Sequence, residues 1–196
     1  MKQLLLATQN NNKVIEIKKM LSHLPIEITS LSDLNDDEDV EETGQTFLEN
    51  AYLKADHFAQ KYQLPTISDD SGLVVNALGG MPGIYSARYS GLGNHENNIK
   101  LLNEMKDHEN RSAYFISVIV LCYPSGKYQA FEGRVEGLIH DKIEGEQGFG
   151  YDPIFYYPPF QTTFGKIPMD QKNQVSHRAN ALNKLKEALY EIINNE

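Results

Sequence analysis

The chain has 196 residues, 40% of them hydrophobic and 23% charged, and its formal net charge is −9 at pH 7. This length and composition predict one folded domain over residues 1–196, large enough for two lobes around a cleft, and exclude a disordered chain. The negative charge argues against a protein that binds nucleic acid. A small anionic substrate is compatible with this charge if lysines, helix N-termini or a metal ion offset the repulsion locally.

The sequence also indicates the compartment in which the protein works. No apolar run has the length needed to cross a bilayer, and the apolar start of the chain is too short for a signal peptide. The lone cysteine, Cys122, lies within an apolar run, which argues against a disulfide framework and a thiolate metal site. We therefore predict a cytoplasmic protein that makes no contact with a membrane.

The first part of the chain alternates between expected strands and helices. Its pattern predicts a strand at 2–8, a helix at 12–22, a strand at 26–29, an acidic loop at 31–45 and a strand at 65–70. Thr46 and Glu49 have the spacing of a capping box, which predicts that a second helix begins after Thr46. Asn50 and Lys54 lie four residues apart on that helix, away from its apolar face.

The second part contains the longest apolar run, at 113–123, which predicts a central strand buried on both faces. A turn at 124–126 leads into a partner strand. A helix is expected at 96–105, and an amphipathic helix closes the chain. The apolar stripe of this last helix is Leu182, Leu185, Leu189, Ile192 and Ile193. Helices interleaved with a mixed sheet predict an α/β architecture.

Near the N-terminus, a strand leads through a polar loop into a helix. The residues of this segment are Thr8, Gln9, Asn10, Asn11, Asn12 and Lys13. A helix N-terminus presents free backbone N–H groups and the positive end of a dipole, which suits a phosphate. Thr8 and Asn10 can add hydrogen-bond donors, and Lys13 a point charge. An asparagine-capped turn explains the same residues without a ligand, so both interpretations stay open.

Two carboxylates, Asp69 and Asp70, end the strand expected at 65–70. Carboxylates suit Mg²⁺, and a metal-bound water beside a carboxylate base is one route to hydrolysis of a phosphoanhydride. Neighbouring residues of a strand point to opposite faces, so one aspartate is expected to act in the chemistry. A capped polar turn is the structural alternative. In the acidic loop, Glu41 and Glu42 offer a further metal ligand, although such loops are usually only solvated.

A glycine-rich loop contains Phe149, Gly150, Tyr151 and Asp152. A glycine beside aromatic residues can open a slot in which a base stacks, and Asp152 can accept hydrogen bonds from ring N–H groups. The same residues would also suit a loop that packs onto the core, and this second interpretation stays open.

At the start of the last helix, Lys172 is followed by Ser176, His177 and Arg178. Ser176 is a good N-cap. His177 and Arg178 offer hydrogen-bond donors to the keto oxygen O6 of hypoxanthine or xanthine, whereas adenine presents an amino donor there. Guanine also carries O6, so these donors do not by themselves exclude GTP. A surface histidine and arginine without a specific role are the alternative.

Together and in this order, the motifs resemble the inosine/xanthosine triphosphate pyrophosphatase family, enzymes that remove noncanonical purine nucleotides. The resemblance runs through Ala7-Thr8-x-Asn10-x-x-Lys13, Glu41-Glu42-Thr43-Gly44, Thr46-Phe47-x-Glu49-Asn50-Ala51-x-x-Lys54-Ala55, Asp69-Asp70-Ser71-Gly72-Leu73, Leu78-Gly79-Gly80-x-Pro82-Gly83-Ile84-Tyr85-Ser86-Ala87-Arg88-Tyr89, Gly148-Phe149-Gly150-Tyr151-Asp152-Pro153-Ile154-Phe155 and Lys172-Asn173-x-x-Ser176-His177-Arg178-Ala179. It covers nearly the whole chain. Gln171 departs from the pattern, because relatives usually carry an acidic residue there, which puts one contact to Lys172 in doubt.

The resemblance implies an α/β fold with a long mixed sheet, flanking helices and two lobes around a substrate cleft. It also implies a homodimer and Mg²⁺-dependent hydrolysis of ITP, dITP and XTP to the monophosphate and pyrophosphate. Glu41 and Asp70 are the implied metal ligands, and Asp70 is also the implied proton acceptor for the attacking water. The implied substrate contacts are Thr8, Gln9, Asn10, Asn11, Asn12, Lys13, Ser71, Phe149, Gly150, Tyr151, Asp152, Lys172, His177 and Arg178.

Two other functions compete with this interpretation. One is a related pyrophosphatase for modified pyrimidine or methylated nucleotides, against which the segment 176–178 and the loop after Gly148 speak. The other is a nucleotide-binding sensor that has lost turnover, and the carboxylates at Glu41, Asp69 and Asp70 argue against it. A purely structural scaffold would leave all of these polar motifs unexplained.

Overall fold

The computed structural model describes residues 1–195, and in this part of the chain seven strands form one mixed sheet. The strands are β1 (Gln3–Leu6), β2 (Glu27–Ser30), β3 (Thr66–Val75), β4 (Ser112–Cys122), β5 (Tyr128–Ile139), β6 (Phe155–Tyr157) and β7 (Thr162–Thr163). Their order in the sheet is β2-β1-β3-β4-β5-β6-β7. β1 pairs in parallel with β2 and β3, whereas β6 is antiparallel to β5 and β7. The expected α/β fold with a mixed sheet is confirmed.

Helices accompany the strands along the described chain. The α-helices are α1 (Asn11–Leu21), α2 (Phe47–Tyr62), α3 (Asn94–Glu104), α4 (Met169–Val175) and α5 (His177–Asn194). Short 3₁₀ helices lie at Ser32–Leu34, Asn76–Leu78, Gly83–Arg88, Asp152–Ile154, Pro158–Phe160 and Phe164–Lys166. Between residues 1 and 195, no helix is both long enough and apolar enough to span a membrane.

The N-terminus of α2 has the capping box that the sequence predicts. The hydroxyl of Thr46 accepts a hydrogen bond from the backbone N–H of Glu49, and the carboxylate of Glu49 accepts one from the N–H of Thr46. These two bonds satisfy N–H groups that the first helical turn leaves without an intrahelical acceptor. The start of α2 is therefore fixed by local sequence.

The chain divides into two compact units. Unit 1 consists of Met1–Asp70, Ser117–Glu132 and the residues from Asn180 on, and unit 2 of Ser71–Ile116 and Gly133–Ala179. Strands β3, β4 and β5 therefore contribute residues to both units. Each unit has a hydrophobic core made of its own residues.

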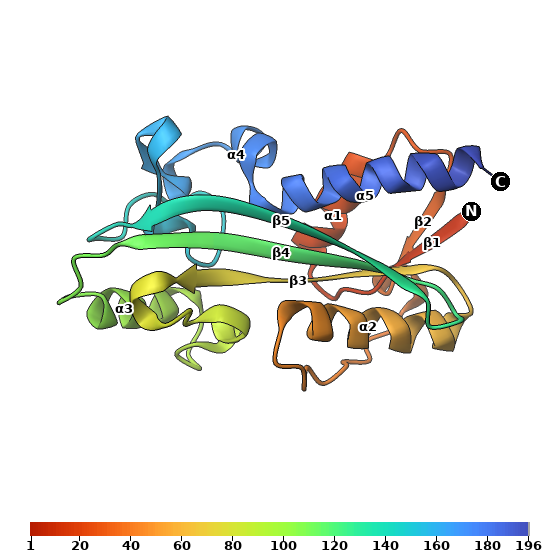
Figure 1. Cartoon of the computed structure of the whole chain (residues 1–196), viewed down its shortest axis with the longest axis horizontal. Helices are drawn as coiled ribbons and strands as arrows, with labels where there is room; N and C mark the ends of the chain where they lie inside the picture. The colour runs from red at the N-terminus through yellow and green to blue at the C-terminus, as the bar shows by residue number, and fades with distance from the viewer. Residues whose placement is uncertain (196) are drawn as a thin grey trace. The chain divides into compact units, whose positions relative to one another are not determined.

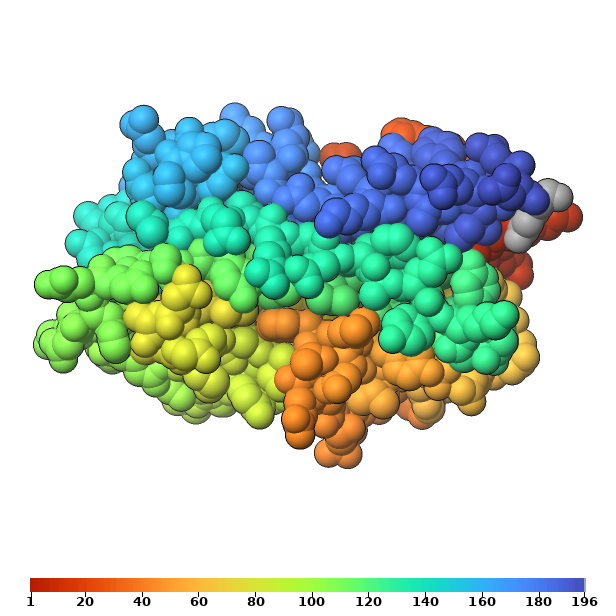
Figure 2. Space-filling model, in the orientation of Figure 1, coloured from red at the N-terminus to blue at the C-terminus, as the bar shows by residue number. Residues whose placement is uncertain are grey.

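In unit 1, the alternation of side chains along β1 places neighbouring leucines in different cores. Leu4 lies in a buried cluster with Ile17 of α1 and Leu185 of α5, whereas Leu5 lies in one with Phe58 of α2. Figure 1 accordingly shows α1 and α5 on one face of the strands of unit 1 and α2 on the opposite face. The outer side of α5 reaches the surface in Figure 2, where it is drawn in blue.

In unit 2, aromatic rings fill much of the core. The ring of Phe115 on β4 lies 4.5 Å from that of Phe155 on β6, measured between centroids, and Leu73 and Val75 of β3 belong to the same buried cluster. This cluster explains why the strand expected at 65–70 continues to Val75. The prediction that it ends at the two aspartates was wrong, because the apolar residues beyond them extend β3 into the core of unit 2.

Candidate active site

The loop between β1 and α1 is held by side chains that cap the helix. The Asn10 side-chain oxygen accepts hydrogen bonds from the N–H groups of Asn12 and Lys13, at 3.0 and 3.3 Å. The hydroxyl of Thr8 accepts one from the N–H of Asn10 at 3.2 Å. The asparagine cap offered as an alternative is therefore present. Asn11 and Asn12 are exposed at the start of the helix, so the cap leaves the helix N-terminus open to solvent.

Gln9, in the same loop, makes contacts that the sequence did not suggest. Its side-chain amide donates to the backbone carbonyls of Asp36 and Glu38, at 3.0 and 3.4 Å. Lys61 and Tyr62 of α2 bind the carboxylate of Asp36, at 2.7 and 2.5 Å. The acidic loop is therefore anchored to the structure on two sides. A contact between Gln9 and a phosphate would have to come from its backbone.

The two aspartates on β3 are both buried: Asp69 has 3% of its surface exposed, and Asp70 has 8%. They have different partners, as expected for neighbours on a strand. A carboxylate oxygen of Asp69 lies 2.9 Å from the ammonium of Lys13. A carboxylate oxygen of Asp70 accepts a hydrogen bond from the side-chain amide of Asn50 at 3.3 Å. One contact of Asp69 is therefore an ion pair, and one contact of Asp70 comes from a neutral donor.

The electrostatics of this cluster distinguish Asp70 further. Burial raises the pKa of Asp70 to about 6, against the opposing effect of the Lys54 and Lys13 ammonium groups, while Glu42 raises it as well. A carboxylate with this pKa is largely ionised at neutral pH and still basic enough to take a proton. These are the properties of a general base.

Lys54 of α2 links the acidic loop to β3. Its ammonium donates to a carboxylate oxygen of Glu42 at 2.7 Å and to the backbone carbonyl of Asp69 at 3.1 Å. Burial lowers the pKa of Lys54, but the carboxylates of Asp70, Glu42 and Asp69 together raise it above its ordinary value. Lys54 therefore stays charged. Glu41, the implied metal ligand, is exposed in the same loop.

The carboxylates of unit 1 suit an Mg²⁺ ion that is bound partly by the protein and partly by the phosphates of a substrate. Within residues 1–195, no group of three or more histidine, cysteine, aspartate or glutamate side chains is arranged to hold a metal ion. Mg²⁺ is usually held by one or two carboxylates together with waters and substrate phosphates, and not by a cage made entirely of protein. Asp70 and the carboxylates of the acidic loop are oxygen ligands of the type that Mg²⁺ prefers.

In unit 2, the glycine-rich loop folds around a buried carboxylate. Asp152, with 1% of its surface exposed, accepts a hydrogen bond from the N–H of Phe149 at 2.8 Å and forms an ion pair with Lys172. Gly148 has φ +74°, and a Cβ atom there would lie 2.0 Å from an oxygen of Asp152. The loop therefore requires glycine at this position. Lys172 has a carboxylate partner although residue 171 is glutamine.

Lys172 and Arg178 both face the ring of Phe149. The ammonium of Lys172 lies 4.8 Å from the ring centroid, and the guanidinium carbon of Arg178 lies 5.7 Å from it. Cations at these distances are attracted to the electron-rich face of an aromatic ring. Phe149 is only partly buried, so it remains a candidate for stacking on a base.

Tyr151 and Gly150 belong to the framework of the loop. The ring of Tyr151 is buried in the core of unit 2, and its hydroxyl donates to the backbone carbonyl of Ser86 at 2.8 Å. The carbonyl of Gly150 accepts a hydrogen bond from the side-chain amide of Asn98 at 2.9 Å. The side chain of Tyr151 therefore fixes the loop, and a substrate contact at this residue would come from the backbone.

The start of α5 carries His177 and Arg178, and both are buried, with 6% and 3% of their surface exposed. Ser176 caps the helix by accepting a hydrogen bond from a backbone N–H of its first turn at 3.1 Å. The ring of His177 stacks on Phe115, with 4.9 Å between centroids. Arg178 donates to the hydroxyl of Ser71 at 3.5 Å. The expectation, within the alternative, that this histidine and arginine lie at the surface was wrong, because both are buried.

The structure thus brings some of the predicted residues together in two groups. Unit 1 brings together Lys13, Asp69 and Asp70, and unit 2 brings together the group of Ser71, Phe149, Asp152, Lys172, His177 and Arg178. Sequence reasoning gave no role to Asn50 and Lys54, both of which contact the aspartate pair. The available signal was their spacing of four residues on one side of a helix, away from its apolar face.

Comparisons with known proteins identify the family of the chain. The model of the Ham1 family matches residues 4–188 of the chain. A dITP/XTP pyrophosphatase of Listeria monocytogenes is 42% identical over 197 residues, which cover 98% of this chain and 97% of that protein. One of Geobacter sulfurreducens is 47% identical over 193 residues, covering 96% of this chain and 97% of its own.

A solved structure leads to the same family. The Ham1 protein of Staphylococcus aureus superimposes with a TM-score of 0.90 at 43% sequence identity, covering 97% of this chain and 99% of that one. The likeness therefore extends over almost the whole chain in both sequence and fold. The protein belongs to the Ham1 family.

Proposed function

We propose that this protein hydrolyses ITP, dITP and XTP to the nucleoside monophosphate and pyrophosphate. The observation that carries the proposal is Asp70, a buried carboxylate whose pKa is raised to about 6 and which lies among lysines of unit 1. Membership of the Ham1 family and the names of the relatives support the same reaction.

The reaction transfers the α-phosphoryl group of the nucleotide to water. The oxygen of water bonds to the α-phosphorus, and the bond from that phosphorus to the α–β bridging oxygen breaks. Pyrophosphate leaves with the electron pair of the broken bond. Asp70 accepts the proton that the attacking water loses. The raised pKa of Asp70 makes it a stronger base near neutral pH than an exposed aspartate.

Unit 1 supplies the charge that a triphosphate needs. A nucleoside triphosphate carries a charge of roughly −4 at neutral pH, and the chain itself is acidic, so positive groups must offset the repulsion locally. Lys13 and Lys54 supply ammonium groups, and the N-terminus of α1 supplies backbone N–H groups. An ammonium has three donors, so the pairing of Lys13 with Asp69 leaves it able to bind a phosphate oxygen.

Mg²⁺ belongs to the proposal as well. We place it on Glu41 and Asp70, as the resemblance implies, with Glu42 as the adjacent carboxylate. When bound, the ion neutralises phosphate charge and polarises the phosphoryl group. The protein side chains hold the nucleotide in line for attack, which supplies much of the catalysis in phosphoryl transfer.

Unit 2 supplies the recognition of the base. Arg178 and His177 are donors to the O6 oxygen of hypoxanthine or xanthine, and Phe149 offers a ring for stacking. An adenine amino group at that position would leave these buried donors without an acceptor, which disfavours ATP. Lys172 adds a positive charge beside the ring of Phe149.

The test is pyrophosphate release from dITP, XTP, dATP and dGTP side by side, with and without Mg²⁺. Metal-dependent turnover of dITP and XTP far above the other two supports the proposal. Binding of all four nucleotides without turnover would favour the sensor instead. Equal turnover of all four would contradict the recognition assigned to His177 and Arg178.

The remaining parts of the proposal concern the state of the protein in the cell. We propose one functional domain, a homodimer and a cytoplasmic location, on the strength of the family resemblance and the cysteine usage. Sedimentation velocity of the purified protein tests the homodimer, and a monomer at micromolar concentration would contradict it.

A further inference from the structure

Asn50 is a polar side chain of the first turns of α2 that is completely buried, with 0% of its surface exposed. Burying an amide is costly unless both of its ends form hydrogen bonds. Both ends of Asn50 do so. Its oxygen accepts a hydrogen bond from the backbone N–H of Gly44 at 2.8 Å, and its NH₂ group donates to a carboxylate oxygen of Asp70 at 3.3 Å.

The chemistry of the two partners fixes the orientation of the amide. A backbone N–H can only donate, so the oxygen of Asn50 must face Gly44. An ionised carboxylate can only accept, so the NH₂ group must face Asp70. The side chain therefore connects the loop that carries Glu41 and Glu42 with the carboxylate on β3. No other arrangement of this amide satisfies both partners.

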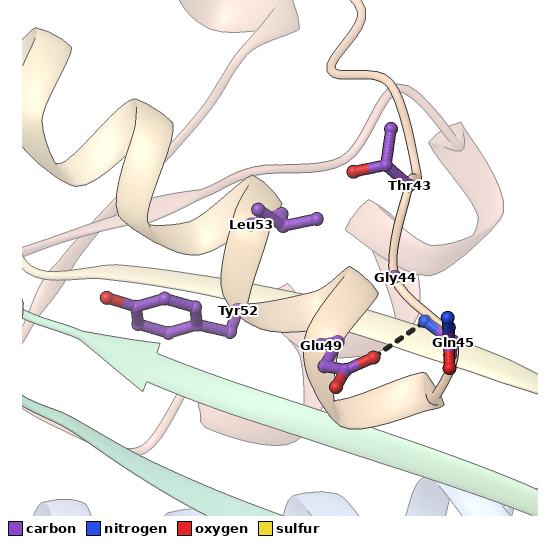
Figure 3. Close-up of a pocket in the computed structure, with 6 residues that line it drawn as sticks. All are labelled: Thr43, Gly44, Gln45, Glu49, Tyr52 and Leu53. Carbon is purple, nitrogen blue, oxygen red and sulfur yellow. Dashed lines mark hydrogen bonds between the residues drawn. The ribbon is translucent and has the colours of Figure 1, made fainter.

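The loop approaches α2 closely at Gly44, as Figure 3 shows for Thr43, Gly44 and Gln45 beside the helix. A Cβ atom at position 44 would lie 2.6 Å from the side-chain oxygen of Asn50 and 2.6 Å from the Cβ of Glu49. Distances this short do not occur between real atoms of these kinds. Glycine is thus required at position 44 so that its N–H can reach Asn50.

We propose that Asn50 is a positioning residue that fixes the catalytic carboxylate of Asp70 relative to the loop carrying Glu41 and Glu42. The inference rests on the proposed function, in which these groups act together on the triphosphate. Asn50 does not itself touch the reacting atoms. Its contribution is to hold a carboxylate and a loop from different parts of the chain in one arrangement.

The first test compares Asn50→Ala with Thr46→Ala. Thr46 caps the same helix but has no contact with Asp70, so its loss lowers the melting temperature and leaves the positioning intact. We expect Asn50→Ala to lower kcat for dITP about 10- to 100-fold, the range for partners that orient catalytic or metal-binding groups. KM should change far less. Thr46→Ala should keep its kcat, and thermal denaturation gives the loss of stability of each variant.

A second readout does not depend on activity. In the metal-free protein, the Gly44 amide should exchange with solvent about tenfold faster in Asn50→Ala than in wild type, because it has lost its acceptor. Thr46→Ala should leave this rate unchanged. The exchange is measured by NMR on ¹⁵N-labelled protein, in which Gly44 gives a signal of its own.

Asn50→Asp distinguishes the effects of the two hydrogen bonds that the Asn50 side chain forms. A carboxylate of the same size can still accept from Gly44, so the exchange rate of that amide stays near wild type. It has no proton to donate to Asp70 and places a like charge beside it, so kcat should fall at least as far as in Asn50→Ala. Wild-type kcat in Asn50→Asp would overturn the inference, as would equal kcat values in Asn50→Ala and Thr46→Ala.

Gly44→Ala disturbs the hydrogen bond between Gly44 and Asn50 by changing its backbone partner. It should lower kcat, and in the double variant with Asn50→Ala the two losses should be less than additive, because both changes remove the same contact even though Gly44→Ala also crowds the Cβ of Glu49. Additive losses would overturn the inference. Failure of the proposed function is distinguishable, because the wild-type protein would then not release pyrophosphate from dITP at all.

Discussion

Replacing Asp70 by asparagine should abolish turnover and at the same time stabilise the metal-free protein. Burial raises the pKa of Asp70 from 3.8 to about 6, and this shift already includes the attraction of Lys54 and Lys13. A shift of roughly 2 units, at about 1.4 kcal/mol each, means that ionised Asp70 costs about 3 kcal/mol of folding free energy at neutral pH. Asparagine has the same shape and no charge.

The pH dependence of this effect follows from its sign. The folded-state pKa lies above the unfolded one, so the unfolded chain releases the proton first as pH rises. The cost is therefore absent below about pH 4, grows up to about pH 6 and is constant above. Urea denaturation in EDTA, from about pH 8 down to about pH 4.5, should show an advantage of Asp70→Asn that shrinks with decreasing pH.

Asp69→Asn is the matched control. It removes a buried ion pair with Lys13 at 2.9 Å and should lower stability under the same conditions. Mg²⁺ should raise the denaturation midpoint of wild type and not that of Asp70→Asn, because a ligand stabilises only the state that binds it. An Asp70→Asn variant that is less stable than wild type at about pH 8 in EDTA would refute the reasoning. Wild-type turnover in this variant would remove Asp70 from the mechanism.

Other predictions concern positions in both units. His177→Ala should lower the ratio of kcat/KM for ITP to that for ATP about tenfold or more, and equal weakening of both substrates would contradict base recognition. Gly148→Ala should lower the free energy of unfolding by about 1–2 kcal/mol through its left-handed φ alone. It should also raise KM, because the new Cβ displaces Asp152 from Lys172. An unchanged KM and melting temperature would contradict this prediction. Cys122 is fully buried, and burial raises the pKa of its thiol to about 11, so it should react with a disulfide reagent at about pH 8 only after denaturation. Fast reaction of Cys122 with the reagent in the native protein would contradict this prediction.

Features that depend on neighbours in the chain could be predicted from the sequence. The capping box at Thr46 formed as expected, because its two hydrogen bonds join residues three positions apart. The helix expected at 12–22 is observed as Asn11–Leu21, and the strand expected at 113–123 as Ser112–Cys122. Periodicity and capping are local signals, so one sequence is enough to detect them.

Short elements with weak local signals were missed. Strands β6 and β7 have three and two residues, and α4 has seven. Strands of this length are defined by their pairing, and β6 lies between β5 and β7. The continuation of β3 beyond Asp70 was missed for a related reason. Ser71 and Gly72 resemble a turn locally, and it is the core of unit 2 that holds Leu73 and Val75 in an extended strand.

The motifs alone indicated the residue types of the candidate site, and with them the family and its reaction, because carboxylates, lysines and glycines at fixed spacings are read directly from the sequence. What each side chain contacts was decided by the tertiary structure. Gln9 binds the acidic loop, Asp69 pairs with Lys13, and Asn50 connects Gly44 with Asp70. These contacts join residues far apart in the chain, and their hydrogen bonds form only once packing has brought both partners out of water and into reach.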